Sequence, residues 1–380
     1  MNDPFKSIRP FHDEEVEKVV FGLLKDKNLF EALAKINYPT LSKIFIGLTR
    51  NLIRNKFKSI FGEAKSIRGF QSSLAPLVEA MIKNTTLGFS ISGEENFLKK
   101  PTIFIGNHRD ISLDSLFLNF SLFQRQKDTV RIAIGDNLLD GGYAEKIMRL
   151  NKSFVVHRNI SGVKETFKKL SRLSKYINLS IEKDKESVWI AQKEGRAIDG
   201  NDFTDEAVLK MLHLDQRKKH SIEEWVSQVN LTPIVISYEL DPLDGVKAKR
   251  WKELGSLSKG ENNERGINEL IQGIIGQKGR VHLHICKSLK GFKGEMADLV
   301  RVIDKQIIQN FKLWPINHAA AYELSKRDSK YGIFDESLLS EETNKLLMSR
   351  LIDQDTVARE KMLITYARPL INKQKSQKRS

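Results

Sequence analysis

Short β-branched runs alternate with helical patterns from about residue 98 onward, and this alternation constrains the fold more than any other feature of the sequence. The expected strands are residues 102–106, 129–134, 153–157, 187–191, 231–238 and 280–286. Helical periodicity lies between several of them, notably at residues 115–124, 163–181 and 266–276. Because parallel strands need a long crossover between them, this order predicts an α/β fold with a largely parallel sheet flanked by helices.

Helical patterns dominate both ends of the chain. We predict an N-terminal helical region at residues 1–97, an α/β domain at 98–315 and a C-terminal helical extension at 316–370. Residues 371–380 are polar and basic, a composition that predicts a disordered tail.

The chain is strongly basic, with 63 Lys and Arg residues against 48 Asp and Glu, for a formal net charge of +15. An excess of this size favours anionic partners, such as lipid headgroups, nucleic acid, phosphorylated metabolites or acidic carrier proteins. Pro39 breaks the first helical pattern, and residues 41–60 then combine apolar and basic side chains at helical spacing. This helix is expected either at an anionic membrane surface or packed on the domain behind it.

The sequence also bears on the compartment. Cys286 is the only cysteine, which excludes a disulfide within the chain and suits a reducing compartment. The N-terminal residues have no apolar signal core, and no stretch approaches the roughly 20 apolar residues of a spanning helix. We therefore expect a cytoplasmic protein, peripheral on the inner face of the membrane.

The segment at residues 102–120 carries the clearest chemical signal. A strand ends at Gly106, His108 follows it, and Asp114 falls on the first turn of the next helix. Ligands bind at the carboxyl ends of strands in open α/β sheets, and a carboxylate there can fix the tautomer of a basic histidine. Asp110 is the alternative partner, although it is better placed to cap the helix. The competing interpretation is a loop histidine beside a capping acid.

Three further blocks follow in order. Arg158 comes after the strand at 153–157, Glu194-Gly195-Arg196 follows the strand at 187–191, and Pro233 introduces an apolar strand. Gly195 permits a tight turn, and a guanidinium such as that of Arg196 can bind a phosphate through two donors.

Together, these blocks resemble the glycerol-phosphate acyltransferase family, which includes glycerol-3-phosphate and 1-acylglycerol-3-phosphate acyltransferases. The resemblance covers residues 100–242 and implies that His108 is a general base with Asp114 as its catalytic partner. The residues implied to bind the substrate phosphate are Arg158, Glu194, Gly195, Arg196 and Arg109. Two departures stand out, since the His108-to-Asp114 spacing is one residue longer than usual and no residue separates Gly195 from Arg196.

The resemblance implies transfer of a fatty acyl group from acyl-CoA or acyl carrier protein, as co-substrate, to a hydroxyl of either acceptor, without a cofactor. No Gly-x-Ser-x-Gly elbow occurs, which favours direct transfer over an acyl-enzyme and disfavours a hydrolase. His282 and His284 alternate along an expected strand and lack flanking acids, so no metal site is predicted. The alternative is a non-catalytic basic protein that binds an anionic membrane surface or nucleic acid, but no nucleic-acid signature is present and no nucleic acid is expected.

Overall fold

The computed structural model describes residues 3–97, 100–136, 142–158, 160–253 and 259–378. By their internal contacts, the residues form two compact units. Unit 1 comprises Met1–Met81 and Thr129–Ile160, and unit 2 comprises Ile82–Asp128 and Ser161–Ser380. Two described strands pair in unit 1, and five described strands form a mixed, mostly parallel sheet in unit 2.

Unit 1 is mainly helical. Its helices are α1 (Asp13–Leu24), α2 (Lys27–Asn37), α3 (Pro39–Ile44), α4 (Ile46–Phe61), most of α5 (Ile67–Thr85) and α7 (Tyr143–Leu150). Pro39 occupies the first turn of α3, where its missing N–H costs nothing, and separates α3 from α2 as expected. Strands β3 (Arg131–Gly135) and β4 (Ser153–Val156) pair in parallel.

The core of unit 1 is a run of aromatic rings between its helices. Phe30 of α2 meets Phe57 of α4 edge-on at 5.5 Å, and Phe61 stacks on Phe70 of α5 at 4.8 Å. The outer face of the α3–α4 segment is different, because large apolar side chains there stay exposed. These side chains, which we call the α3–α4 surface, are Tyr38, Leu41, Ile44, Phe45, Leu48 and Leu52.

Unit 2 is built around five strands in the order β1-β7-β6-β2-β5. They are β1 (Phe89–Ser92), β7 (Val281–Ile285), β6 (Thr232–Tyr238), β2 (Ile103–Gly106) and β5 (Val188–Ala191). The β6–β7 pair is antiparallel, whereas β1–β7, β2–β6 and β2–β5 are parallel. Strands β2, β5 and β6 therefore end at the same edge, where the site described below is located.

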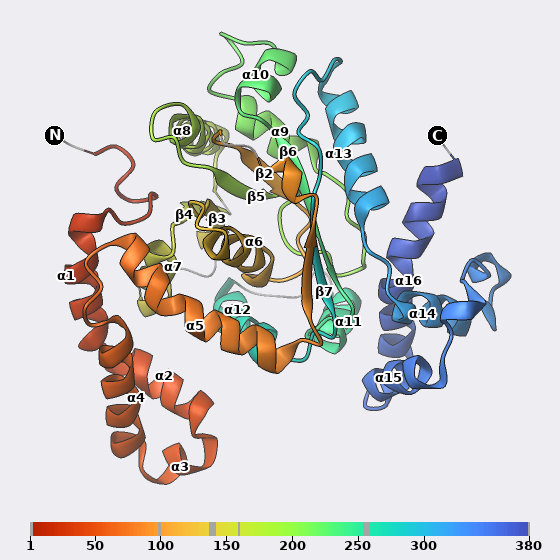
Figure 1. Cartoon of the computed structure of the whole chain (residues 1–380), viewed down its shortest axis with the longest axis horizontal. Coiled ribbons are helices and arrows are strands. Elements are labelled where there is room, and N and C mark those ends of the chain that lie inside the picture. The colour runs from red at the N-terminus through yellow and green to blue at the C-terminus, as the bar shows by residue number, and fades with distance from the viewer. Residues whose placement is uncertain (1–2, 98–99, 137–141, 159, 254–258, 379–380) are drawn as a thin grey trace. The chain divides into compact units, whose positions relative to one another are not determined.

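Helices surround this sheet and extend beyond it (Figure 1). They are α6 (Leu113–Gln124), α8 (Val163–Glu182), α9 (Glu206–His213), α10 (Ile222–Gln228), α11 (Asp244–Lys252), α12 (Lys259–Ile275) and α13 (Met296–Asn310), with 3₁₀ turns at Glu94–Asn96, Ser329–Tyr331 and Glu336–Leu338. Helices α14 (Pro315–Ser325), α15 (Glu341–Leu351) and α16 (Thr356–Lys378) pack together around Ala320, Leu347 and Met362.

The predicted α/β fold with helical regions at both ends is confirmed. The six expected strands are present, each with its ends shifted by at most two residues. Strand β1 is an addition, and it falls within the region expected to be helical. The disorder predicted for residues 371–380 is wrong for residues 371–378, which complete α16. Asn372 is buried there and Gln374 donates a hydrogen bond to the Ile333 carbonyl, so the polar residues are anchored.

Among the described residues, no helix combines the length and the apolar character that crossing a membrane requires.

Candidate active site

The site begins where β2 leaves the sheet. The amide group of Asn107 takes the place of backbone pairing with β6, because its Nδ2 donates to the Ile236 carbonyl at 3.0 Å and its Oδ1 accepts from the Ile236 N–H at 2.8 Å. The backbone can then turn away without leaving these buried groups unpaired. His108 therefore follows Asn107 in the loop between β2 and α6, held at the carboxyl end of the strand.

Asp114, on the first turn of α6, organises this loop. Its Oδ2 contacts His108 Nδ1 at 2.9 Å and accepts hydrogen bonds from the backbone N–H groups of Arg109 at 2.8 Å and Asp110 at 3.0 Å. The side chain is 2% exposed, so water does not compete for these oxygens. Because a carboxylate accepts hydrogen bonds, Nδ1 carries the proton in this pair and Nε2 is left with a lone pair.

Tyr238, the last residue of β6, completes the environment of Asp114. Its hydroxyl donates a hydrogen bond to Asp114 Oδ1 at 2.9 Å. Burial and the negative charge of Asp114 hold the pKa of Tyr238 well above its usual value, so the phenol stays protonated and remains a donor. The sequence analysis missed this residue, although its position at the carboxyl end of a strand was a usable signal.

Asp110 has a separate role in the same loop. Its Oδ1 accepts from the backbone N–H groups of Ser112 and Leu113, both at 3.0 Å, and caps the start of α6. Burial, together with the charge of Asp114, raises the pKa of Asp110. The loop formed by residues 109–112 accommodates the extra residue between His108 and Asp114, and leaves Asp114 facing the imidazole.

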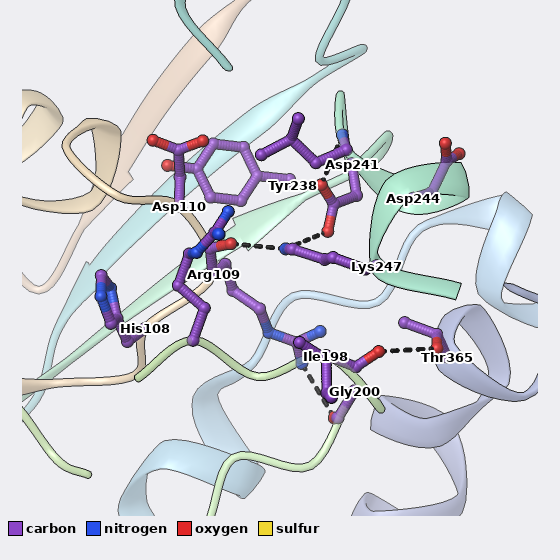
Figure 2. A network of polar contacts seen from close by, with 12 residues as sticks. His108, Arg109, Asp110, Ile198, Gly200, Tyr238, Asp241, Asp244, Lys247 and Thr365 are labelled. Atoms are coloured by element: carbon purple, nitrogen blue, oxygen red, sulfur yellow. Dashed lines mark hydrogen bonds and ion pairs between the residues drawn. The ribbon is translucent and has the colours of Figure 1, made fainter. Parts of the chain in front are cut away.

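Arg109 points away from His108, into a buried network. Its guanidinium pairs with Asp202 and donates to the Gly200 carbonyl at 3.0 Å, while its own carbonyl accepts a hydrogen bond from Lys247 at 2.5 Å. Figure 2 shows the Lys247 ammonium between the Arg109 carbonyl and Asp241. Burial alone would raise the pKa of Asp241, but the neighbouring Lys247 ammonium lowers it below its usual value. These contacts anchor the loop, and a phosphate role for Arg109 stays a prediction.

The Glu194-Gly195-Arg196 turn lies against the same loop. Gly195 has a φ of +74°, a conformation that favours glycine, and nothing lies within 4 Å of a Cβ added there. The backbone N–H of Ala197 donates to the His108 carbonyl at 2.8 Å. Arg196 pairs with Glu269 of α12, and Glu194 is exposed. The sequence analysis did not identify Glu269, which lies 73 residues after Arg196 in the chain.

Arg158 belongs to unit 1 and is described within it. Its backbone N–H donates to Asp136 Oδ1 at 3.0 Å, and the other oxygen of Asp136 contacts His157 Nδ1 at 3.0 Å. Asp136 thus orders the turn that follows β4, to which Arg158 belongs. The predicted phosphate role of Arg158 stays a prediction.

Several buried polar atoms on β5 and in the turn after it have no hydrogen-bond partner within the described part of the chain. They are Trp189 Nε1, both amide atoms of Gln192, and Arg196 Nη1. The Trp189 ring meets the His108 ring edge-on at 5.9 Å between centroids. Because buried polar groups are normally paired, these atoms mark the surroundings of His108 as a candidate site.

The other histidines that the sequence brought to attention have local partners. His282 on β7 contacts the hydroxyls of Ser90 and Ser92, both at 2.8 Å, and Ser92 also contacts His284 at 2.8 Å. Burial lowers the pKa of His282 to about 4, so the ring is neutral at ordinary pH. These contacts account for the histidines as part of the β1–β7 pair.

A comparison of the sequence with known protein families bears on this site. Residues 88–205 match the family model described as Acyltransferase, and they include His108, Asp114 and the Glu194-Gly195-Arg196 turn. This chain carries an acyltransferase-family domain. The matched segment spans about a third of the chain and covers β1 to β5, whereas β6, β7 and α11 to α16 lie beyond it.

Two further comparisons add little. The crystal structure of the 1-acyl-sn-glycerophosphate (LPA) acyltransferase PlsC from Thermotoga maritima aligns over 73% of this chain and 95% of its own, at 14% identity and a TM-score of 0.34. A TM-score of this size is too low to indicate a shared fold, so the family assignment depends on the family model. No curated protein matches the sequence.

Proposed function

We propose that this acyltransferase moves a fatty acyl group from acyl-CoA or acyl carrier protein to a hydroxyl of glycerol-3-phosphate or 1-acylglycerol-3-phosphate. The contact between His108 Nδ1 and Asp114 carries the proposal, because it leaves Nε2 of the ring available for a proton at the carboxyl end of β2. The match of residues 88–205 to an acyltransferase family supports the reaction class.

The proposed reaction is a direct transfer. His108 Nε2 takes the proton of the acceptor hydroxyl as its oxygen attacks the thioester carbonyl carbon. Asp114 stabilises the imidazolium that forms, and Tyr238 and two backbone N–H groups hold the carboxylate in place. The tetrahedral intermediate then collapses, the carbon–sulfur bond breaks, and the leaving thiolate recovers the proton from His108. The products are the acyl ester and the free thiol.

A phosphate-bearing acceptor suits the charge of the turn beside His108. Arg196 Nη1 is a buried donor without a partner among the described residues, and phosphate oxygens are acceptors that match it. The turn is joined to the His108 carbonyl through Ala197, so a phosphate bound there would fix the acceptor close to the base. Arg158, Glu194 and Arg109 remain candidates for the same role on the strength of the resemblance.

The test is an acceptor and donor panel. Purified protein is incubated with labelled acyl-CoA or acyl carrier protein and with glycerol-3-phosphate, 1-acylglycerol-3-phosphate or unphosphorylated glycerol. We expect transfer to at least one phosphorylated acceptor and a far slower reaction with glycerol. Absence of transfer from both donors to both phosphorylated acceptors would contradict the proposal, and binding of nucleic acid in that case would favour the non-catalytic alternative.

We also propose that the α3–α4 surface attaches the enzyme to an anionic membrane. Ile44 is 71% and Phe45 is 54% exposed, although both are large and apolar. No acidic residue occurs from position 32 to 62, and this stretch carries six basic residues, namely Lys35, Lys43, Arg50, Arg54, Lys56 and Lys58. Apolar side chains among positive charges, without acids, suit insertion between anionic lipid headgroups.

Vesicle sedimentation tests this attachment. We expect the double variant Ile44→Ser, Phe45→Ser to bind anionic vesicles at least about tenfold more weakly, because two side chains that would enter the bilayer are lost. Val163→Ser, which changes an 89% exposed apolar residue at the start of α8, serves as the matched control and should bind like wild type. Equal binding of wild type to anionic and zwitterionic vesicles at low salt would contradict the proposal.

A further inference from the structure

The ammonium group of Lys247, on α11, lies in the interior of unit 2, and the side chain is 2% exposed. It donates a hydrogen bond to the Arg109 carbonyl at 2.5 Å and pairs with the Asp241 carboxylate (Figure 2). Burial of a cation is costly, and an apolar side chain of similar volume would usually serve stability as well or better. A charge at this position therefore indicates a role beyond packing.

The Arg109 carbonyl that Lys247 contacts belongs to the same peptide group as the Asp110 N–H. In a trans peptide these two groups point in opposite directions, so the ammonium and the acceptor of the N–H lie on opposite sides of one rigid plane. That acceptor is Asp114 Oδ2, at 3.0 Å. The same oxygen contacts His108 Nδ1 at 2.9 Å. A single peptide group therefore connects the buried charge to the carboxylate that orients the imidazole.

The second backbone donor to Asp114 Oδ2 provides a comparison within the same loop. It is the Arg109 N–H, at 2.8 Å, and the carbonyl of its peptide group, that of His108, accepts a hydrogen bond from the Ala197 N–H at 2.8 Å. Both donors are thus supported from the far side of their peptide, which fixes the plane and polarises the N–H. The supporting group is a neutral amide in one case and the Lys247 ammonium in the other, and the charged donor makes the stronger bond.

The position of Lys247 is set by helices beyond the family-matched segment. In the first turn of α11, the Asp244 carboxylate accepts hydrogen bonds from Arg350 of α15 at 2.6 and 2.8 Å and from the Tyr366 hydroxyl of α16 at 2.7 Å. Lys247 follows three residues later, on the same side of the helix. Helices α15 and α16 therefore hold α11 in place, and with it the ammonium against the Arg109 carbonyl.

We propose that Lys247 is a positioning residue for the His108–Asp114 pair, acting through the peptide between residues 109 and 110 to hold and polarise an N–H group that binds the Asp114 carboxylate. This inference rests on the proposed function and deepens it, because it extends the catalytic assembly to α11. The ammonium contacts the peptide and Asp241 rather than the imidazole. Its loss should therefore slow the proton transfer and leave the binding of both substrates unchanged.

Steady-state kinetics of the full-length protein tests this role. Lys247→Met keeps an apolar chain of similar length and removes the charge. We expect kcat to fall about tenfold or more, the usual effect of losing a charge-assisted hydrogen bond, with the KM of donor and of acceptor within about twofold of wild type. Lys249→Met makes the same change at an exposed position of α11 and should behave like wild type. If wild type transfers acyl groups and Lys247→Met keeps its kcat, the inference is wrong and the proposed function stands.

A double variant separates positioning from a purely structural ion pair. Lys247→Met leaves Asp241 without its ion partner, which destabilises the fold, whereas Lys247→Met with Asp241→Asn removes both charges. We expect the double variant to recover the melting temperature towards that of wild type while kcat stays about tenfold low. A return of kcat to the wild-type value would overturn the inference, because Lys247 would then serve only to neutralise Asp241. A rise in either KM in place of the fall in kcat would also overturn it.

Nuclear magnetic resonance of protein with isotope-labelled histidine provides a readout that needs no turnover. The signals of His108 are assigned by their loss in His108→Ala. We expect the Nδ1–H signal of His108 to shift in the double variant and to stay in place in Lys249→Met, because Nδ1 contacts the carboxylate that Lys247 is inferred to position. Identical His108 signals in wild type and the double variant would overturn the inference. A shifted signal in a protein without acyl transfer would contradict the proposed function alone.

Discussion

The loop at residues 107–114 and the α3–α4 surface hold their functional side chains in opposite ways. In the loop, polar groups are buried and held by named partners, as Asp114 is by His108 Nδ1, two backbone N–H groups and the Tyr238 hydroxyl. On the α3–α4 surface, apolar side chains such as Ile44 are exposed. Their neighbours include Lys43 and Arg54, and no carboxylate occurs within the segment.

The contrast shows what each region can tolerate. Hydrogen bonds depend on direction, so a proton transfer at His108 needs each partner at its place. Contact with a lipid surface depends on the apolar area and on charge, and it is nearly independent of direction. Conservative changes should therefore be severe in the loop and mild on the α3–α4 surface.

Among the substitutions that test this contrast, Asp114→Asn is expected to have the largest effect. The amide oxygen can keep the hydrogen bonds to the loop, but the negative charge that stabilises the imidazolium is lost. We expect kcat to fall roughly 10²-fold or more while the protein stays folded. Initial-rate kinetics beside a thermal melt measures both quantities.

The matched control for this variant is Asp128→Asn, which changes an exposed carboxylate soon after α6 and should leave kcat unchanged. If Asp114→Asn kept wild-type turnover, the Asp114 carboxylate would serve only to order the start of α6. Substitutions in the loop would then be tolerated as well as substitutions on an exposed surface.

Replacing one glycine in each region by alanine should have smaller effects. At Gly273, facing the loop, a Cβ would lie 2.4 Å from Asp110 Oδ2, so Gly273→Ala should lower the free energy of unfolding by about 1–3 kcal/mol and reduce activity. At Gly47, on α4, nothing lies within 4 Å of an added Cβ, so Gly47→Ala should raise stability by up to about 1 kcal/mol. Urea denaturation measures both, and equal shifts would break the comparison.

The sequence was informative wherever structure follows from local pattern. Buried apolar runs of four to seven residues identified the strands of the central sheet, because a strand buried on both faces reads as a continuous apolar segment. Strand β1 was missed because its four residues, FSIS, are only partly buried and carry two serines. Its pairing with β7 depends on residues about 190 positions away, which no local pattern contains.

The same limit applies to the site. His108 and Asp114 could be paired from the sequence because only six positions separate them. Tyr238 and Glu269 reach Asp114 and Arg196 through the fold, so their roles became visible only with the contacts. The polar end of α16 was predicted as disordered from composition, yet Lys373 donates to the Phe311 carbonyl and Asn372 contacts Asn201, which anchors the helix.

The most direct test of the central claim is acyl transfer by His108→Ala. The variant removes the only group to which we assign the acceptor's proton, so we predict a loss of about 10²–10⁴ in kcat with labelled acyl donor and a phosphorylated acceptor, and an unchanged melting temperature. Turnover equal to that of wild type would show that the imidazole is not the base, and the proposed mechanism would be wrong.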